Sequence, residues 1–133
     1  MKMYVSVSMT ISIAHRYYDE RVSYEENYKN YGIDVRLHGH DYTFDVVVSK
    51  DVDERGYSVH TGYLQDILNE EIFEKLDHTY LNEHPYFKNV TPTMERVVKF
   101  LWDSLKPRLD KEGITLELIR LHGKNSYLEY RGE

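Results

Sequence analysis

The sequence predicts an α+β domain in which an antiparallel sheet of four strands carries two helices on one face, in the order β-β-α-α-β-β. Three observations support this fold class. Residues 3–13 and 35–50 alternate apolar and polar side chains, which is typical of half-buried strands. Residues 63–76, and a segment that begins at Thr91, place apolar residues at helical spacing instead. Two shorter runs with strand character lie near the C-terminus.

Each of the first two strands carries its apolar residues on one face. In residues 3–13 this face holds Met3, Val5, Val7, Met9, Ile11 and Ile13. In residues 35–50 it holds Tyr42, Phe44, Val46 and Val48. Between the strands, residues 16–34 are polar, rich in tyrosine and without a clean period, so we expect a long irregular loop, which in a small domain is often functional. Residues 51–56 indicate a turn.

Two helices and two strands follow this turn. The first helix has an apolar stripe of Leu64, Ile67, Leu68, Ile72 and Leu76. In the second helix we expect Thr91 as the N-cap, Pro92 at the first helical position and Lys106-Pro107 as the end. The third and fourth strands are expected at residues 114–121 and 125–131. Such a sheet has two open edges, which an oligomer could close.

Composition and charge exclude several classes of protein. A chain of 133 residues suits one domain, residues 1–133. The chain has seven histidines and no cysteine. The absence of cysteine excludes disulfides, thiolate metal sites and a cysteine nucleophile. With a net charge of −6 and scattered basic residues, we expect neither a nucleic acid nor a membrane as partner. No apolar run is long enough to cross a membrane and no signal-peptide pattern is present, so we expect a soluble, cytoplasmic protein.

The sharpest local motif is His38-Gly39-His40 in the second strand. Side chains at i and i+2 of a strand point to the same side, so both imidazoles could bind one metal ion. His15, near the end of the first strand, continues the apolar face of that strand. The three histidines converge if the two strands form a hairpin. Three neutral histidines with an open fourth position are typical of catalytic zinc. The alternative is a set of ordinary, partly exposed strand histidines.

A second candidate is Asp77-His78, which directly follows the first helix. An adjacent carboxylate and imidazole could act as a general acid and base. A charged pair near a helix C-terminus is also a common surface feature, so the pair by itself decides little.

Seven short motifs extend this pattern along almost the whole chain. They are Ala14-His15, Leu37-His38-Gly39-His40, Gly62-Tyr63-Leu64, Leu76-Asp77-His78, Leu81-Asn82, Pro92-Thr93-Met94-Glu95 and the stretch from Tyr127 to Tyr130. In this order they resemble the 6-pyruvoyltetrahydropterin synthase and 6-carboxytetrahydropterin synthase family, pterin enzymes of the tunnelling fold.

The resemblance implies a ββααββ subunit that assembles into a homotrimer or homohexamer, with strands joined into a barrel and active sites at subunit interfaces. It implies Zn²⁺ on His15, His38 and His40, acting as a Lewis acid on the side-chain oxygens of a dihydropterin. It also implies that Asp77 and His78 relay protons. Thr93 and Glu95 lie in a matching motif and are the implied substrate-binding residues, together with His122.

The chain departs from this family at the position of the catalytic Cys, four residues before His38, where it has Asp34. One branch of the family carries Glu there and cleaves the side chain to leave 6-hydroxymethyl-dihydropterin. Asp34 resembles that branch but is one methylene shorter. Glu25 and Glu26, in the same loop, are rival candidates, and Asp34 could also be an ordinary loop carboxylate.

A second departure concerns substrate binding. The family has a Glu followed by Thr that anchors the amino-pyrimidine edge of the pterin, and here these positions are His122 and Gly123. A carboxylate accepts two hydrogen bonds, whereas a neutral imidazole accepts one. A third departure places His60 where relatives have Asp.

Three functional hypotheses follow. The first is a zinc-dependent lyase that acts on the C6 side chain of 7,8-dihydroneopterin or its triphosphate, either cleaving it or forming a 6-pyruvoyl or 6-carboxy product. The second keeps the fold and zinc but has a non-pterin substrate. The third is a non-catalytic, metabolite-binding oligomer.

Overall fold

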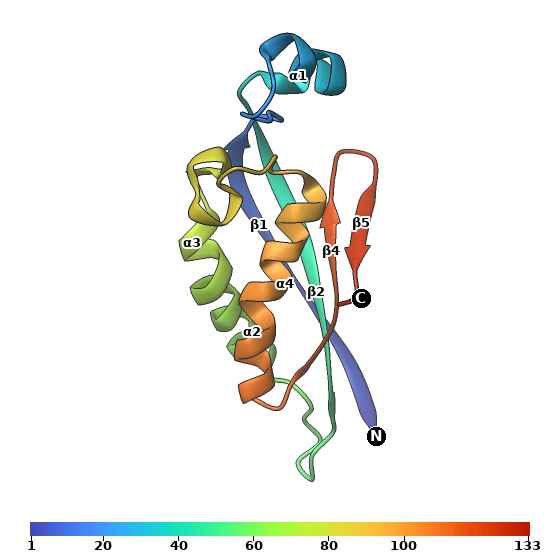
Figure 1. Ribbon diagram of the computed structural model, residues 1–133. Coiled ribbons are helices and arrows are strands. Elements are labelled where there is room, and N and C mark those ends of the chain that lie inside the picture. Colours follow the sequence, from blue (N-terminus) through green and yellow to red (C-terminus); the bar gives the residue numbers. More distant parts are fainter.

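The computed structural model describes all residues 1–133 and has two layers, a sheet and a layer of helices (Figure 1). One sheet contains five strands in the order β3-β1-β2-β4-β5. The strands are β1 (Lys2–His15), β2 (His38–Asp51), β3 (Thr79–Tyr80), β4 (Thr115–His122) and β5 (Tyr127–Tyr130). The helices are α1 (Tyr24–Tyr31), α2 (Thr61–Leu68), α3 (Glu74–Leu76) and α4 (Met94–Lys111), and a π-helical turn, Asn69–Phe73, joins α2 to α3. The prediction of an α+β fold is confirmed.

The sheet differs from the expected one at its edge. β3, which the sequence did not predict, pairs parallel to β1 through Ile13 and Ala14, while all other pairs are antiparallel. Two residues are too few to give a period in the sequence. The second strand begins at His38 rather than residue 35, because Gly32–Val35 forms a 3-10 turn closed by the Arg36 N–H on the Ile33 carbonyl.

The second long helix, α4, also differs from the expected boundaries. Its N-cap is Thr93, whose hydroxyl accepts from the Arg96 N–H, whereas Thr91 is buried and donates to the Tyr18 carbonyl. The helix continues past Pro107 to Lys111. A proline this close to the C-terminus removes one backbone hydrogen bond, and the buried Leu105 and Leu109 on either side keep the last turn packed on the sheet.

The expected loop between the first two strands contains a helix, α1. Its residues are mostly polar, so no apolar stripe marked it. The missed signal was the capping sequence: the Ser23 hydroxyl accepts from the Glu26 N–H, acidic residues occupy the first turn, and Gly32 ends the helix with a φ of 61°.

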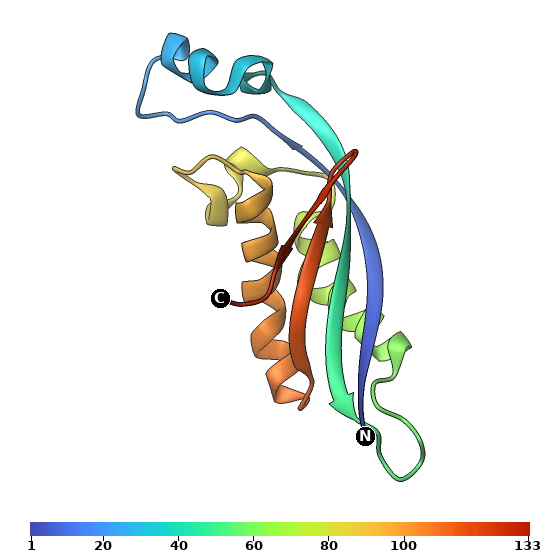
Figure 2. The same ribbon diagram turned by 90° about the vertical axis from the view of Figure 1, so that its right-hand side faces the viewer.

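The two faces of the sheet have opposite character. On one face, Phe44, Val46 and Val48 are fully buried under α2 and α4, as their alternation predicted (Figure 2). The other face carries no helix (Figure 2), and most of its side chains are polar. There, cross-strand hydrogen bonds join Ser8 to Asp45 (2.5 Å), Thr10 to Thr43 (2.8 Å) and Ser12 to Asp41 (2.6 Å). A polar face of this kind can remain in contact with water.

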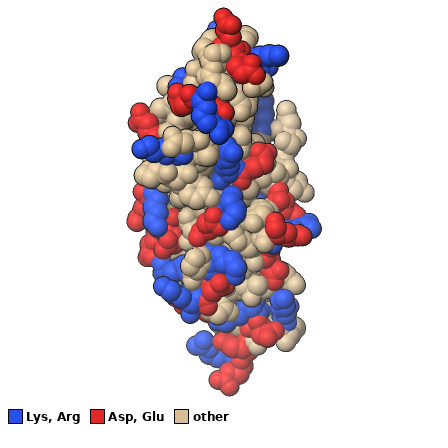
Figure 3. Space-filling model, viewed as in Figure 1, with Lys and Arg blue, Asp and Glu red and all other residues tan.

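Charged side chains of both signs intermingle over the helical face, without a basic stripe (Figure 3). Several belong to i,i+4 pairs on α4, including Lys99 with Asp103 and Lys106 with Asp110. None of the helices is both long and apolar enough to cross a membrane.

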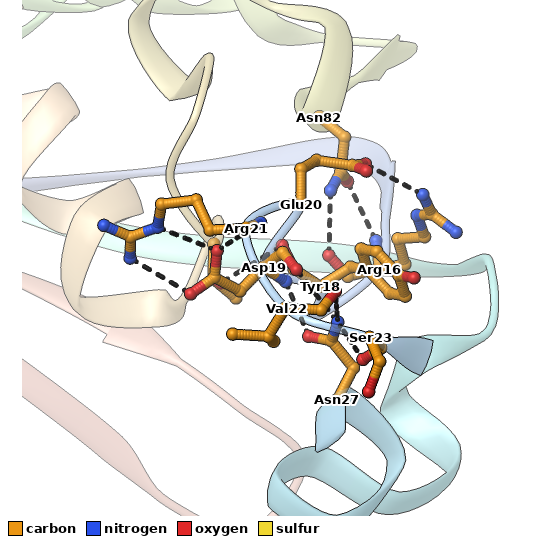
Figure 4. Close-up of polar contacts among 10 residues, drawn as sticks. Arg16, Tyr18, Asp19, Glu20, Arg21, Val22, Ser23, Asn27 and Asn82 are labelled. Atoms are coloured by element: carbon orange, nitrogen blue, oxygen red, sulfur yellow. Dashed lines mark hydrogen bonds and ion pairs between the residues drawn. The ribbon is translucent and has the colours of Figure 1, made fainter. Parts of the chain in front are cut away.

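The segment from Arg16 to Leu37 forms an arm that projects beyond the helices and carries α1 (Figures 1 and 2). Side chains of two asparagines fix its first half (Figure 4). Asn82 accepts from the Arg16 N–H (2.9 Å) and donates to the Arg16 carbonyl (3.0 Å). Asn27, fully buried, accepts from the Asp19 N–H (2.7 Å) and donates to the carbonyls of Asp19 and Ser23. The arm is therefore ordered through amide side chains rather than through an apolar core.

We expect Asn27→Ala to loosen the arm, because it leaves buried backbone groups without partners, at a cost of about 1–3 kcal/mol. Amide hydrogen exchange of residues 16–37 should accelerate, while the amides of β2 and α4 keep their protection. Asn30→Ala, an exposed change in the same helix, is the matched control. Unchanged exchange in Asn27→Ala would contradict the proposed role of this side chain.

Candidate metal centre

The β1–β2 hairpin brings three histidines together at its upper end. Opposite residues in the register are His15 with His38 and Ile13 with His40. In the alternation along each strand, His15, His38 and His40 fall on the face that the helices cover. Their imidazoles therefore lie on the same side of the sheet. The convergence that the sequence predicted for a hairpin is therefore present.

The geometry of the cluster suits one metal ion. One nitrogen from each imidazole lies within 4.8 Å of the other two. The ring centroid of His15 is 4.6 Å from that of His38 and 5.0 Å from that of His40, with edge-on packing. His15 is fully buried, His38 half-buried and His40 exposed, so the cluster opens to one side. Three protein ligands and an open side are the arrangement of a catalytic rather than a structural metal site.

Backbone carbonyls determine which nitrogen of His15 and of His38 is free to bind a metal ion. His15 Nδ1 lies 3.0 Å from the Pro92 carbonyl and His38 Nδ1 lies 2.7 Å from the Arg36 carbonyl. A carbonyl only accepts hydrogen bonds, so each Nδ1 carries the proton and each Nε2 presents a lone pair. The Nε2 of His15 is buried and has no partner within the chain. A buried, unpaired nitrogen is costly, and a metal ion would satisfy it.

The electrostatics favour the neutral form of His15 and His40, and metal binding requires neutral imidazoles. Burial, with contributions from His38 and His40, lowers the pKa of His15 from 6.5 to about 4. Burial and His38 also lower the pKa of His40, while the Asp34 carboxylate opposes this shift. The donor set therefore fits a divalent metal with affinity for nitrogen ligands.

Two tyrosines and two carboxylates surround the cluster. The rings of Tyr17 and Tyr42 pack against His15 at 5.3 and 6.2 Å, and Tyr42 stacks on His40 at 5.2 Å. Asp34, in the 3-10 turn, and Glu95, in the first turn of α4, both contribute to the raised pKa of Tyr17, after its burial. Asp34 and Glu95 are thus the acids that act electrostatically on this site. Tyr17 and Tyr42 were not predicted, although Tyr42 has the parity of His38 and His40.

The other residues singled out from the sequence do not belong to the histidine cluster. Glu25 and Glu26 are exposed in the first turn of α1, on the projecting arm (Figure 1). Thr93 serves as the N-cap of α4. His60 is the N-cap of α2 and accepts from the Tyr63 N–H.

Asp77 and His78 form a pair at the outer edge of β1. Asp77 accepts from the Ser12 N–H (2.9 Å) with one oxygen and lies 2.6 Å from His78 Nδ1 with the other. The His78 side chain is 81% exposed and its backbone has a φ of 59°, which is uncommon outside glycine. No hydrogen bond, ion pair or ring contact joins the pair to the three histidines within one chain. Asp77 therefore holds the His78 imidazole, which is open to solvent.

His122 lies on the polar face of the sheet, opposite to the face that carries the histidine cluster. Its Nε2 is 2.7 Å from Asp45 on the neighbouring strand, and its ring packs beside Tyr127. The partner residue Asp45 was not predicted, because only the β2–β4 register brings it close to His122.

Comparison with known proteins agrees with this geometry. The family profile described as 6-pyruvoyl tetrahydropterin synthase matches residues 4–133. The chain belongs to this family. The 6-pyruvoyl tetrahydrobiopterin synthase of Dictyostelium discoideum is 37% identical over 124 residues, covering 92% of this chain and 90% of the relative. The human enzyme of the same name is 32% identical over 133 residues, covering 97% and 91%.

Two solved structures of family members share the fold. The 6-pyruvoyl tetrahydropterin synthase of Caenorhabditis elegans has a TM-score of 0.89 at 22% identity, covering 100% of this chain and 97% of the other. A catalytic-residue mutant of the Plasmodium vivax 6-pyruvoyltetrahydropterin synthase has a TM-score of 0.64 at 12% identity, covering 98% and 99%. Membership of the family predicted from the ordered motifs is thereby confirmed, and so is the tunnelling fold.

We expect purified protein to retain about one divalent metal ion per chain, and His38→Ala to lose it, because two imidazoles hold a metal ion far more weakly than three. Elemental analysis after extensive dialysis measures the stoichiometry. His84→Ala is the control, since His84 packs against Phe87 and Phe100 away from the cluster. Retention of metal by His38→Ala would show that the cluster is not the site.

The metal-free protein should lose stability as the pH falls from 6.5 towards 4. The pKa of His15 is about 4 in the folded chain and 6.5 in its ordinary state, so the unfolded chain binds the additional proton within this window. The loss should approach about 3 kcal/mol by pH 4 and level off below it. Urea denaturation with a chelator present measures it, and His15→Gln should remove this part of the pH dependence. An identical pH profile in the variant would contradict the assignment.

Proposed function

We propose that this protein is a zinc-dependent lyase that acts on the C6 side chain of 7,8-dihydroneopterin or its triphosphate. The observation that carries the proposal is the cluster of His15, His38 and His40, with its buried Nε2 and its open side. The names of the family relatives, synthases of 6-pyruvoyl tetrahydrobiopterin and of 6-carboxy-5,6,7,8-tetrahydropterin, supply the substrate class. We propose a single domain over residues 1–133 and a cytoplasmic location.

Zinc is the proposed metal because three neutral imidazoles without a thiolate or a carboxylate suit it well. When bound, zinc would act as a Lewis acid on hydroxyl oxygens of the substrate side chain. The carbonyls of Pro92 and Arg36 would hold the imidazoles of His15 and His38 in the orientation that this binding requires.

Asp77 and His78 are the proposed proton relay. The Ser12 N–H, followed by His78, lowers the pKa of the Asp77 carboxyl, so Asp77 remains a carboxylate and orients the imidazole. Since His78 Nδ1 faces this carboxylate, its Nε2 is the atom that would take a proton from a substrate carbon or return it to a neighbouring one.

We propose that this relay works on the metal centre of another copy of the chain. His78 is exposed beside β1, whose outer edge pairs with β3 only at Ile13 and Ala14, and the outer edge of β5 at the opposite end of the sheet has no partner strand. Strand edges with free backbone groups favour association. An edge-to-edge trimer, alone or doubled into a hexamer, would bring His78 beside a neighbouring subunit and close the sheet into a barrel.

Asp34 is the proposed assisting residue in place of the family's Cys. It lies in the turn beside the cluster, and its charge acts on His40 and Tyr17. A carboxylate at this position favours the side-chain-cleaving reaction, with 6-hydroxymethyl-dihydropterin as the product, over formation of a 6-pyruvoyl or 6-carboxy product. Glu25 and Glu26 are less suited, because they are on α1 at the far end of the arm.

One observation favours an alternative substrate. His122 occupies the position of the family's anchoring Glu and is engaged by Asp45, so the pyrimidine edge of a pterin would meet an imidazole rather than a carboxylate. A related heterocycle is therefore the second candidate. A non-catalytic, metabolite-binding oligomer is the reading that remains if no turnover is found.

The test is turnover of 7,8-dihydroneopterin triphosphate and of 7,8-dihydroneopterin by the zinc-loaded protein, with identification of the product by mass spectrometry. We expect His78→Ala to lower kcat by about 10²–10⁴-fold, the usual contribution of a general acid–base group. Asp34→Asn should reduce it by at least about tenfold for the same reason. Metal content should be unchanged in both variants.

Glu54→Gln, an exposed change in the turn after β2, is the control for removal of a carboxylate. Equal rates for wild type and His78→Ala would reject the relay. The absence of turnover of both pterins by a metal-loaded wild type would reject the pterin lyase and leave the other heterocycle and the binding protein as candidates.

A further inference from the structure

A second cavity lies at the end of the molecule opposite to the arm and the metal centre. The loop between β2 and α2, residues 52–60, projects there beyond the lower end of the helices (Figures 1 and 2). The cavity measures about 420 Å³ and is lined by the end of β2, this loop, the start of α2 and the turn from α4 to β4. This volume is within the range of small-ligand pockets. None of its lining residues belongs to the proposed lyase site.

The charged side chains of this cavity leave one positive and one negative group without a counter-ion. Arg55 and Asp53 pair with each other (3.3 Å), and two backbone N–H groups of the loop also donate to Asp53. The ammonium group of Lys50 has no ion pair and no hydrogen bond within the chain. The Glu112 carboxylate accepts from the Tyr63 hydroxyl (2.8 Å) with one oxygen and has no cationic partner. The cavity therefore offers a free cation and a free anion from two separate elements.

His60 adds a hydrogen-bond donor whose orientation is fixed. Its Nδ1 accepts from the Tyr63 N–H (3.2 Å), so the hydrogen of the neutral ring is on Nε2. The ring also lies against the backbone of Gly62, where a Cβ would come within 3.0 Å of His60 Cε1. The Nε2–H has no partner within the chain, and His60 lines the cavity. It is thus available to a ligand with an acceptor group.

The remaining lining is aromatic and aliphatic. Tyr57 and Tyr63 line the cavity although their side chains are 59% and 40% exposed. Val59 and Ile114, which are buried, contribute aliphatic surface between them and the core. Aromatic rings supply a large apolar contact area with specific geometry, so this part of the cavity suits a flat, apolar group.

A ligand with a single charge would leave either Lys50 or Glu112 unpaired, whereas a zwitterion matches both. We propose that this cavity binds a free α-amino acid with an aromatic side chain. Its carboxylate accepts from Lys50 and from the Nε2–H of His60, and its ammonium group donates to Glu112. Its ring packs against Tyr57 and Tyr63. The site is separate from the metal centre and does not depend on the proposed function.

The test titrates the metal-containing, full-length protein with three ligands that share a phenyl ring. They are L-phenylalanine, 3-phenylpropionate, which lacks the ammonium group, and 2-phenylethylamine, which lacks the carboxylate. Backbone amide NMR shifts report both affinity and location. L-Phenylalanine should bind with a Kd of about 1 mM or tighter and shift the amides of residues 50–63 and 112–114. Each of the other two ligands should bind at least about tenfold more weakly, because it leaves one charged group of the cavity unpaired.

Variants assign each contact to one end of the ligand. Lys50→Met should weaken L-phenylalanine binding by at least about tenfold and leave 2-phenylethylamine unchanged, since that ligand has no carboxylate. Glu112→Gln should weaken L-phenylalanine to a similar extent and leave 3-phenylpropionate unchanged. His60→Asn removes the Nε2 donor but keeps a good N-cap for α2, so affinity should fall while stability is retained. Lys88→Met, at an exposed lysine outside the cavity, is the control.

Three results would overturn this inference. The first is a set of Kd values within about threefold of each other for the three ligands, which would show that the charges are not recognised. The second is a shift pattern confined to the histidine cluster, which would show that the amino acid binds the metal instead. The third is the absence of saturation by about 10 mM L-phenylalanine. None of these results bears on the lyase, because turnover of the pterins is measured without the amino acid.

Discussion

The register of the β1–β2 hairpin is the constraint on which the site depends. The two strands pair without interruption from Lys2 with Asp51 to His15 with His38. A slip of one residue would turn every imidazole of β2 to the opposite face and expose Phe44, Val46 and Val48 to solvent. Burial of these residues under α2 and α4 therefore holds the register, and the register places the histidines. The apolar core at the centre of the hairpin and the polar cluster at its end are two consequences of one alignment.

The surroundings of the cluster come from segments that are far apart in the sequence. The carbonyl that orients His15 belongs to Pro92, just before α4, and the one that orients His38 belongs to the turn that ends the arm. The arm itself is held to the body through Asn82 and folded on itself through Asn27. Buried amides and an unpaired imidazole nitrogen cost stability unless each finds its partner, so this end of the molecule depends on specific polar contacts.

Two Asp–His pairs flank the sheet and are built alike. In each, the aspartate receives a second hydrogen bond from β1: Asp77 from the Ser12 backbone and Asp45 from the Ser8 hydroxyl. In each, one imidazole nitrogen is engaged and the other is free. The pairs differ in position, since His78 is exposed beside β1 and His122 lies at the end of β4 on the polar face of the sheet.

The sequence by itself determined the fold class, the two long strands, the helical stripe from Leu64 to Leu76 and the identity of the three clustered histidines, because each depends on local periodicity. It also carried the signal for α1, in the capping residues Ser23 and Glu26, but an apolar period could not detect a polar helix. Only the tertiary structure decided the free nitrogen of His15, the pairing of His122 with Asp45 and the exposure of His78. These depend on contacts between residues up to 77 positions apart, for which the sequence contains no period to read.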